Sequence, residues 1–463
     1  MQTIEETELE KELEIPEGEA DRTEYFARLA EKRASGQFAL SPLNLSDEQR
    51  RLYVRETLRE DHQFRILNRP EGAQAKFDKL ANSVFKFFRG TALLYYRDYA
   101  GDDVGLPVVF SIGDIHPENF GVMPNESRAP IFGVNDFDEA YYAPFSWDVK
   151  RGSVGFWLAA KENGFKKKKR KKIVKKFVKG YLKGLREFSR NDREKWHQMR
   201  MDNSPKMIRK LLKSAMTDRE DFLEEYVDLD KARFRPTDEI VPLTSDLEKF
   251  QDVMRRYEDE NDIPERDHNG GIKVKDVAIK KDSGTASLGL DRYFVLIEGP
   301  SKDPTDDIIL ELKQSRRSAL HGLVQGEPGY HDDDHEAGRI ARSHAIHLCG
   351  GDPYYGKTEI DGKSFLVRER SPYKEGVDLD DLDFKHFKKY ASICGLSLAV
   401  AHARSDQDEE DMDEEAENLI LESIIPDVFV DDVIRFTKVA AKRIKRDYEA
   451  FVDDHELGAF QFL

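Results

Sequence analysis

Apolar residues recur at three- and four-residue intervals through the first hundred residues, in DRTEYFARLAEKRAS, DEQRRLYVRETLREDHQFRIL and AQAKFDKLANSVFKFF. This spacing brings the apolar side chains to one face of a helix, so amphipathic helices are expected over about 21–100. Helical patterns return in DVKRGSVGFWLAAKENGF, DFKHFKKYASICGLSLAVAHARS and DDVIRFTKVAAKRIKRDYEAF. Residues 1–20 are acidic and are expected to form a mobile N-terminus.

Two short β-type runs interrupt the helical pattern, LPVVFSIGD and APIFGVNDFDE. Each run ends in acidic residues, and the segment HPENFGVMPNESR between them contains the Pro, Asn and Ser that are typical of loops. Two strands that deliver carboxylates at their C-terminal ends indicate a functional site.

A second β-rich stretch is expected over about 270–372. IKVKDVAIKKDSGTASLGLDRYFVLIEG and DIILELKQS predict strand, glycine turn, strand, loop and strand; HEAGRIARSHAIHL predicts a helix and KSFLVRERS a further strand. Residues 190–265 are charged and are expected to be helical. The acidic spacer DQDEEDMDEEAEN is expected to be a solvated loop.

Charge and composition limit the possible partners. Charged residues make up 36% of the 463-residue chain, and the net charge of −17 argues against a nucleic-acid coat because polyanions would be repelled. The two cysteines, Cys349 and Cys394, cannot form a disulfide framework or a multi-Cys zinc site. The N-terminus lacks the apolar core of a signal peptide, and no run of about 18 apolar residues could span a membrane. A cytoplasmic protein without a nucleic-acid or membrane partner is expected, and the oligomeric state stays open.

The run KKKKRKKIVKKFVKGYLKGLREF has two interpretations. Its lysines could form the solvated face of a helix whose apolar stripe is packed, or they could form a patch for an anionic partner. The solvated face is favoured, because Ile173, Phe177 and Tyr181 continue an apolar stripe at helical spacing.

The segment GDIHPEN places Asp114 at a strand end and Asn119 five residues later. It resembles the catalytic loop of protein-kinase-like enzymes, in which the Asp orients the acceptor hydroxyl and the Asn oxygen binds a metal. Within that superfamily it is most similar to small-molecule kinases of the aminoglycoside phosphotransferase type. A neutral amide ligand can hold Mg²⁺ without adding negative charge beside a triphosphate.

The segment NDFDE ends the next β-type run. Asp136 matches the metal-binding Asp of kinase-like folds, and Asp138 stands where their Asp-Phe-Gly motif has Gly. Asp148, at the end of PFSWD, resembles an Asp that braces the catalytic loop, and it could also cap a helix. Either acidic segment alone could be a turn with helix caps, but both in order favour a site for Mg²⁺ and phosphate.

The turn GTASLG contains Gly284, Ser287 and Gly289, whose backbone N–H groups could cradle phosphates, although a plain hairpin would use the same glycines. Lys313, in the strand IILELKQS, resembles the kinase lysine that binds the α- and β-phosphates. A charge inside a strand needs an anionic partner unless it faces solvent at an edge. Glu336, in the following helix, is the nearest candidate for that partner.

The order of these parts differs from that of ordinary kinases, where the glycine loop and lysine precede the catalytic loop. LSLAVAHARS resembles the helix before the catalytic loop in small-molecule kinases, so joining residue 405 back to about 105 restores the usual order. The expected fold class is therefore α+β, a two-lobed and circularly permuted kinase-like fold. Residues 21–265 would form the catalytic lobe with a helical insertion, 266–375 the β-rich nucleotide lobe, and 376–463 the helices that complete the catalytic lobe.

Several motifs together resemble the bacterial family called domain of unknown function 2252, from about residue 60 to 405. They are FFRGTALLYYRDYA, GDIHPENFG, NDFDEAYYAPFSWDVKR, GTASLGLDRYFVLIEG, LKQS and AHARS, in this order. The resemblance implies a family motif around Arg89, which would contact phosphate or pair with a carboxylate. It leaves His402 and Arg404 either reaching the site or packing at a helix end. Ala286 departs from the family, which tends to have Gly there.

These residues predict an ATP- and Mg²⁺-dependent phosphotransferase of kinase-like type that acts on an unidentified acceptor, for which a small molecule is one candidate. The expected roles are catalysis by Asp114, Asn119 and Asp136, metal binding by Asn119, Asp136 and Asp138, and nucleotide binding by Gly284, Ser287, Gly289 and Lys313. Nucleotidyl transfer would use the same parts.

Two other hypotheses stay open. A metal-dependent phosphoesterase could use Asp114, His116 and Asp136 as ligands of a two-metal site, although the further His and Asn motifs of such enzymes are missing from the sequence. A catalytically silent nucleotide-binding regulator is the other, and the intact acidic residues and Lys313 argue against it.

Overall fold

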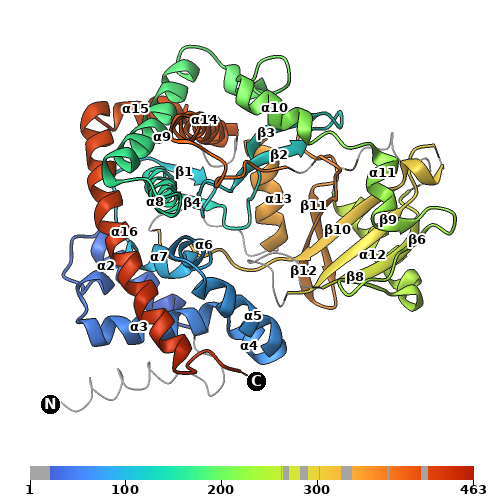
Figure 1. Cartoon of the computed structure of the whole chain (residues 1–463), viewed down its shortest axis with the longest axis horizontal. Coiled ribbons are helices and arrows are strands. Elements are labelled where there is room, and N and C mark those ends of the chain that lie inside the picture. Colours follow the sequence, from blue (N-terminus) through green and yellow to red (C-terminus); the bar gives the residue numbers. More distant parts are fainter. Residues whose placement is uncertain are drawn as a thin grey trace.

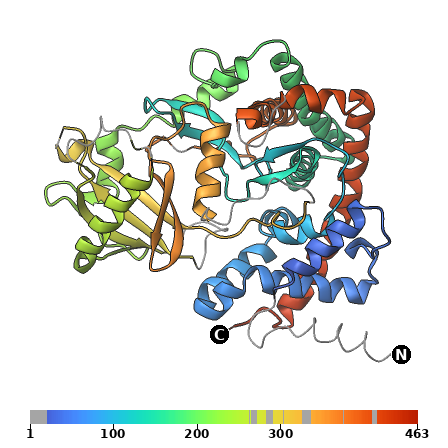
Figure 2. The same cartoon turned by 180° about the vertical axis from the view of Figure 1, so that it is seen from behind.

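The computed structural model describes residues 21–261, 263, 271–281, 290–301, 303–324, 336–373, 375–407 and 415–462 as a mixed α+β fold. A helical part and a sheet-rich part lie side by side, with one helix between them (Figures 1 and 2). Within these residues, no helix is long and apolar enough to cross a membrane. Segment 1–20, expected to be mobile, lies outside the described residues.

The first helices form where the apolar periodicity predicts them. Ser46 begins one with a capping box, because its hydroxyl accepts the Gln49 N–H at 3.4 Å and the Gln49 side chain accepts the Ser46 N–H at 3.1 Å. Pro70 occupies the first turn of another. The apolar faces are buried in the largest hydrophobic core. These helices are α2 (Thr23–Ala34), α3 (Asp47–Asp61), α4 (Gln63–Asn68), α5 (Pro70–Ala81), α6 (Val84–Arg89) and α7 (Ala92–Asp98).

Two pairs of antiparallel strands carry the acidic segments. One pair is β1 (Val108–Ser111) with β4 (Tyr141–Pro144), and the other is β2 (Phe120–Pro124) with β3 (Pro130–Val134). GDIHPEN follows β1 and NDFDE follows β3, which confirms that both acidic segments leave the ends of strands.

Long helices pack around these strands and bury most of the apolar residues. They are α8 (Ser146–Glu162), α9 (Lys167–Phe188), α14 (Phe384–Ala403) and α16 (Pro426–Glu456). α9 contains the basic run; Ile173, Phe177 and Tyr181 are buried and most of its lysines are exposed, as expected of a solvated face. α9 and α14 touch backbone to backbone, because a Cβ at Gly180 would overlap the carbonyl oxygen of Ser392.

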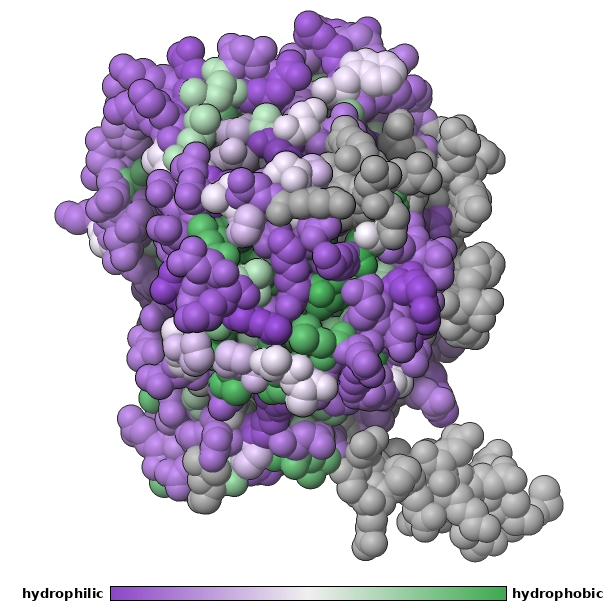
Figure 3. All heavy atoms as spheres, turned by 90° about the vertical axis from the view of Figure 1, so that its right-hand side faces the viewer, coloured by the Kyte–Doolittle hydropathy of each residue, from purple (hydrophilic) through white to green (hydrophobic). Residues whose placement is uncertain are grey.

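The sheet-rich part is a six-stranded antiparallel sheet in the order β11-β12-β10-β9-β8-β7. Helix α12 (Leu247–Glu260) packs against one face, which the side chains of Leu310 and Leu312 line. Helix α13 (Glu336–His347) lies between the sheet and the helical part (Figure 1). Hydrophilic side chains cover most of the outer side of the sheet-rich part. Hydrophobic side chains are visible mainly in the gaps between the hydrophilic ones (Figure 3). The strands are β7 (Ile240–Pro242), β8 (Val274–Lys280), β9 (Arg292–Ile297), β10 (Ile308–Gln314), β11 (Gly356–Ile360) and β12 (Lys363–Glu369).

Segment 190–265 differs from the expected helical structure. It contains α10 (Lys206–Ser214), α11 (Arg219–Glu224) and α12, but also the short strands β5 (Val227–Asp228), β6 (Arg233–Phe234) and β7. β7 pairs with β8, so the sheet begins before residue 266. Strands this short carry too little alternation to be seen in the sequence, and pairing with a neighbour stabilises them.

The acidic spacer is not the continuous loop that the sequence predicts, because η6 (Arg404–Gln407) covers its first two residues. Residues 408–414 lie outside the described residues, and α15 (Ala416–Glu422) begins within the spacer.

Candidate active site

A buried carboxylate holds the loop that carries Asp114. Asp148 accepts the N–H groups of Ile112 at 2.7 Å and Gly113 at 3.1 Å. His402, at the end of α14, lies 3.1 Å from Asp148 and is itself held by the Tyr181 hydroxyl at 2.9 Å. Asp148 therefore braces the loop, as its resemblance to a bracing Asp predicts.

The helix-capping role considered for Asp148 is wrong. Asp148 lies inside the first turn of α8, the N-cap position is Phe145, and no side chain caps the helix. Its carboxylate oxygens are instead bound by the loop, which leaves them unavailable to the helix end.

The loop itself adopts a left-handed turn. Gly113 has φ +67° and Asp114 has φ +41°, a region that costs a non-glycine residue energy. A Cβ at Gly113 would overlap the carbonyl oxygen of Glu139, so glycine is required there. The Asp114 N–H donates to the hydroxyl of Tyr96 at 3.0 Å, which stabilises the strained residue.

Asp114 is paired with Arg151, a residue that the sequence reasoning missed. The Arg151 guanidinium donates from Nε at 2.7 Å and from Nη2 to the same oxygen, Oδ1. Arg151 is fully buried on α8 and stacks 4.3 Å from the ring centroid of Phe88. The second oxygen of Asp114, Oδ2, lies 3.9 Å from Nε2 of the His116 ring. The only sequence signal for Arg151 is its place one turn after Asp148 on the same helix.

Burial raises the pKa of Asp114 to about 7. The Arg151 guanidinium opposes this rise, and the nearby Glu139 and Asp136 carboxylates add to it. A carboxyl with this pKa exchanges its proton near neutral pH, which suits a general base.

Asn119 and Asp136 lie beside this carboxyl. The Asn119 side-chain amide donates to the carbonyl oxygen of Asp114 at 2.9 Å, which leaves its own Oδ1 free of protein donors within the described chain. Asp136 Oδ1 accepts the N–H of Asp138 at 3.3 Å. Burial and the Asp138 carboxylate raise the pKa of Asp136. The donors are carboxylate and amide oxygens, the ligands that Mg²⁺ prefers, and a cation would relieve the repulsion between the two carboxylates.

Lys313 reaches this cluster from the sheet. Its ammonium forms an ion pair with Asp138, 175 residues away in sequence. Burial opposes ionisation of Asp138, but the Lys313 ammonium outweighs it and holds the pKa of this carboxyl below its usual range. Lys313 therefore does not face open solvent; its side chain is 13% exposed.

Glu336 is not the partner of Lys313. Its carboxylate accepts from Arg339 at 3.2 Å, three residues along α13. Arg339 in turn donates to the carbonyl oxygen of Asp138 at 2.9 Å. The helix after Lys313 therefore contacts the NDFDE loop through an arginine, and the acidic partner comes from the loop itself.

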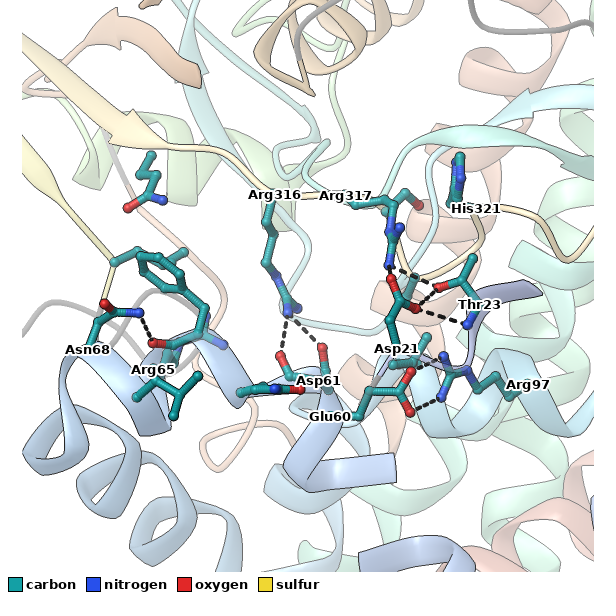
Figure 4. A pocket seen from close by; sticks show the side chains of 18 of the residues that line it. Asp21, Thr23, Glu60, Asp61, Arg65, Asn68, Arg97, Arg316, Arg317 and His321 are labelled. Atoms are coloured by element: carbon teal, nitrogen blue, oxygen red, sulfur yellow. Dashed lines mark hydrogen bonds and ion pairs between the residues drawn. The ribbon is translucent and has the colours of Figure 1, made fainter. Parts of the chain in front are cut away.

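Three adjoining cavities meet at these residues. The central cleft, about 40 Å³, is lined by Asp114, Asn119, Asp136, Asp138, Glu139, Lys313 and Arg316, among others. The aromatic cavity, about 250 Å³, shares Asn119, Asp136 and Lys313 with it and adds Phe137, Tyr355 and Tyr373. The arginine cavity, about 380 Å³, shares Leu290, Gln314 and Arg316 and adds Asp61, Arg317 and His321 (Figure 4). The central cleft thus connects two larger spaces.

The other candidate residues from the sequence lie in different places. Gly284, Ser287 and Gly289 lie outside the described residues. Arg89 pairs with Glu118, so its carboxylate alternative is the one observed. Arg404 donates to the main-chain carbonyl groups of Ile346, Glu194 and Lys195, away from the cleft.

His116 does not line the central cleft. Its ring nitrogens lie 3.2 Å from the Glu118 N–H and 3.4 Å from Arg89 Nε, and burial with the two nearby arginines lowers its pKa well below the usual range. Both ring nitrogens therefore lie within hydrogen-bonding distance of protein N–H groups.

A comparison with curated proteins and with solved structures finds no match. Over residues 68–454 the sequence matches the family described as "Uncharacterized protein conserved in bacteria (DUF2252)". This range includes the GDIHPEN segment, the NDFDE loop, the six-stranded sheet with Lys313, and most of the packed helices. The chain therefore belongs to the DUF2252 family of bacterial proteins.

Proposed function

We propose that the protein is an ATP- and Mg²⁺-dependent phosphotransferase of kinase-like type with a circularly permuted chain. The observation that carries the proposal is the ion pair of Lys313 with Asp138 in the cleft that Asp114, Asn119 and Asp136 also line. A kinase-like site needs these parts together: a lysine for phosphates, an Asn and an Asp for the metal, and an Asp for the acceptor.

The arrangement of the elements supports a permutation. Lys313 lies in β10, the strand after the pair β8–β9 whose connecting segment contains the glycine turn of the sequence, and α13 follows it. The short helix η6 (Arg404–Gln407) that ends α14 lies beside β1, so the chain near 405 returns to the start of the catalytic-loop segment. Function depends on these spatial positions and not on chain order.

Each residue would have a distinct task in the transfer. Asp114 Oδ2 would accept or orient the acceptor proton, while Arg151 holds Oδ1 and keeps the carboxylate in place. Asn119 Oδ1 and Asp136 would hold Mg²⁺, which when bound neutralises phosphate charge. Lys313 would exchange its contact with Asp138 for phosphate oxygens.

The two larger cavities would divide the substrates. The aromatic cavity offers Phe137, Tyr355 and Tyr373 to the flat base of the nucleotide. The arginine cavity would then receive the acceptor, because it shares other lining residues with the central cleft, Leu290, Gln314 and Arg316. In Figure 4, Arg316 and Arg317 project into it from the segment that follows β10.

The charges of the arginine cavity favour an acceptor with an anionic group. Arg316 is paired with Asp61 and Glu139 and Arg317 with Asp21, yet the two arginine side chains stay 33% and 46% exposed. Asp61 is only 8% exposed, so Arg316 presents more charge to the cavity than its partner does. A carboxylate or phosphate on the acceptor would bind these guanidinium groups.

Binding of ATP–Mg²⁺, measured by titration calorimetry, tests the proposal. Asp136→Ala and Lys313→Ala should each weaken binding by at least about tenfold, since each removes a charge that contacts the triphosphate or its metal. Lys249→Ala is the control, because Lys249 pairs with Asp361 on the outside of the sheet-rich part. Unchanged binding in both site variants would show that the kinase-like assignment is wrong.

A further inference from the structure

A second group of carboxylates lies away from the active site, where three segments meet. Asp192 and Glu194 belong to the short helix η2 (Arg193–Trp196) and its cap, Asp406 belongs to η6, and Glu415 and Glu417 belong to the start of α15. Single oxygens of Asp192, Glu194 and Glu415 lie within 4.8 Å of one another, and so do single oxygens of Asp406, Glu415 and Glu417. Glu415 is common to both sets.

Glu194 is the unusual member of this group. Glu194 is fully buried, and neither of its carboxylate oxygens has a hydrogen-bond partner within the described residues. Oε2 of Glu417, a residue only 2% exposed, likewise has no hydrogen-bond partner within the described residues. Buried carboxylates are normally paired or bound to a metal, because leaving one bare costs several kcal/mol.

The nearby positively charged side chains do not bond to the buried carboxylate of Glu194. Arg404 is buried beside the group, but its Nε and Nη1 donate to main-chain carbonyl oxygens, including that of Glu194 itself. Lys195 lies 4.0 Å from Asp192 and not from Glu194. Within the described residues, no positively charged side chain therefore forms a hydrogen bond with the Glu194 carboxylate.

We infer that this cluster is a binding site for a hard divalent cation of the calcium class, held by Glu194, Glu415 and Glu417 with Asp192 and Asp406 at its edge. Calcium binds six to eight oxygens at about 2.3–2.6 Å, so oxygens on opposite sides of the ion lie about 5 Å apart. The spacing of this cluster matches that requirement. Magnesium is a poorer fit, since it demands a stricter octahedron and keeps several waters.

The site joins parts of the chain that support the active-site loop. η6 continues α14, whose His402 contacts Asp148, and Asp148 holds the loop of Asp114. A cation here links the segment after α9 to the end of α14 and the start of α15. The inference does not rest on the proposed function.

Terbium luminescence offers a direct test, because Trp196 lies two residues from Glu194, is 72% exposed, and can sensitise a bound Tb³⁺ ion. The titration uses the full chain with Asp136→Ala, which removes the proposed magnesium ligand. We expect a sensitised Tb³⁺ signal that disappears when Ca²⁺ displaces the ion. Glu194→Gln should weaken the affinity for Tb³⁺ by at least about tenfold. Glu415→Gln, an exposed position, should weaken it as well and guards against a folding defect of the buried variant.

Asp432→Asn, on the exposed side of α16, is the matched control and should leave the titration unchanged. Ca²⁺ should also raise the midpoint of thermal unfolding of the natural chain by a few degrees, and it should not do so in Glu194→Gln. The inference is wrong if the natural chain shows no Ca²⁺ binding below about 1 mM, the weakest range of protein calcium sites. It is equally wrong if neither Glu194→Gln nor Glu415→Gln weakens the titration.

Discussion

At the scale of single residues, Asp114 shows how two opposing effects set the state of one carboxyl. Burial favours its neutral form, and the Arg151 guanidinium favours its ionised form. The contact uses Oδ1 alone, so it holds the side chain while Oδ2 stays outside the ion pair.

The raised pKa of Asp114 predicts a pH-dependent stability difference. Its folded pKa of about 7 lies above the ordinary 3.8, so ionisation destabilises the folded chain progressively as pH rises from about 4 to 7. Asp114→Asn cannot ionise. Relative to the natural chain, this variant should therefore gain about 3 kcal/mol in free energy of unfolding between pH 5 and pH 8. Urea unfolding at both pH values measures the change.

The comparison across pH cancels the constant cost of leaving Arg151 beside an amide. Asp432→Asn, with an exposed carboxylate, should show no such trend. A difference between Asp114→Asn and the natural chain that stays constant from pH 5 to pH 8 would contradict the raised pKa.

At the scale of elements, the contact between α9 and α14 determines where the side chains that brace the Asp114 loop lie. α9 supplies Tyr181 and α14 supplies His402, and the two side chains meet only because the helices approach closely at Gly180 and Gly395. A side chain at either glycine would overlap backbone atoms of the other helix.

Gly180→Ala should consequently destabilise the protein by about 1–3 kcal/mol, because the helices must separate to admit one methyl group. Lys179→Ala, at the neighbouring exposed position, should change stability by less than about 0.5 kcal/mol. Denaturant unfolding of the two variants checks this. Equal stability of Gly180→Ala and the natural chain would mean that the two helices are less closely packed than described.

At the scale of the whole molecule, the candidate active site lies where the sheet-rich part meets the helical part. The sheet supplies Lys313, while the strands and helices of the other part supply the acidic residues and Arg151. The central cleft and its two neighbouring cavities run along this junction.

This arrangement predicts that nucleotide and acceptor binding can be separated by mutation. Arg317→Gln should raise the KM for an anionic acceptor by about tenfold, as loss of a charged hydrogen bond does, without changing the affinity for ATP–Mg²⁺. The measurement is ATP turnover with glucose and with two ring-retaining derivatives that carry an anionic group at C6, glucuronate and glucose 6-phosphate. Arg435→Gln, on exposed α16, is the control. A preference for the neutral compounds would refute the anionic acceptor while leaving the nucleotide site intact.

Several parts of this picture could be predicted from the sequence. The strand ends before Asp114 and Asp136 follow from short apolar runs and loop residues, and the buried face of α9 follows from its apolar stripe. Glu336 was the wrong partner for Lys313, because neighbours along the chain need not be neighbours in space. β5 and β6 were missed because their two-residue pairing leaves no pattern.

The sequence by itself determined the helices, the strands that carry the acidic segments and the residue types able to handle phosphate, because these depend on periodicity and turn chemistry within a few residues. Only the tertiary structure decided that Lys313 meets Asp138, that Arg151 holds Asp114, and that Glu194 is buried without a partner. Burial and Coulomb interactions act through space, so the state of a charge depends on neighbours that folding brings from distant parts of the chain.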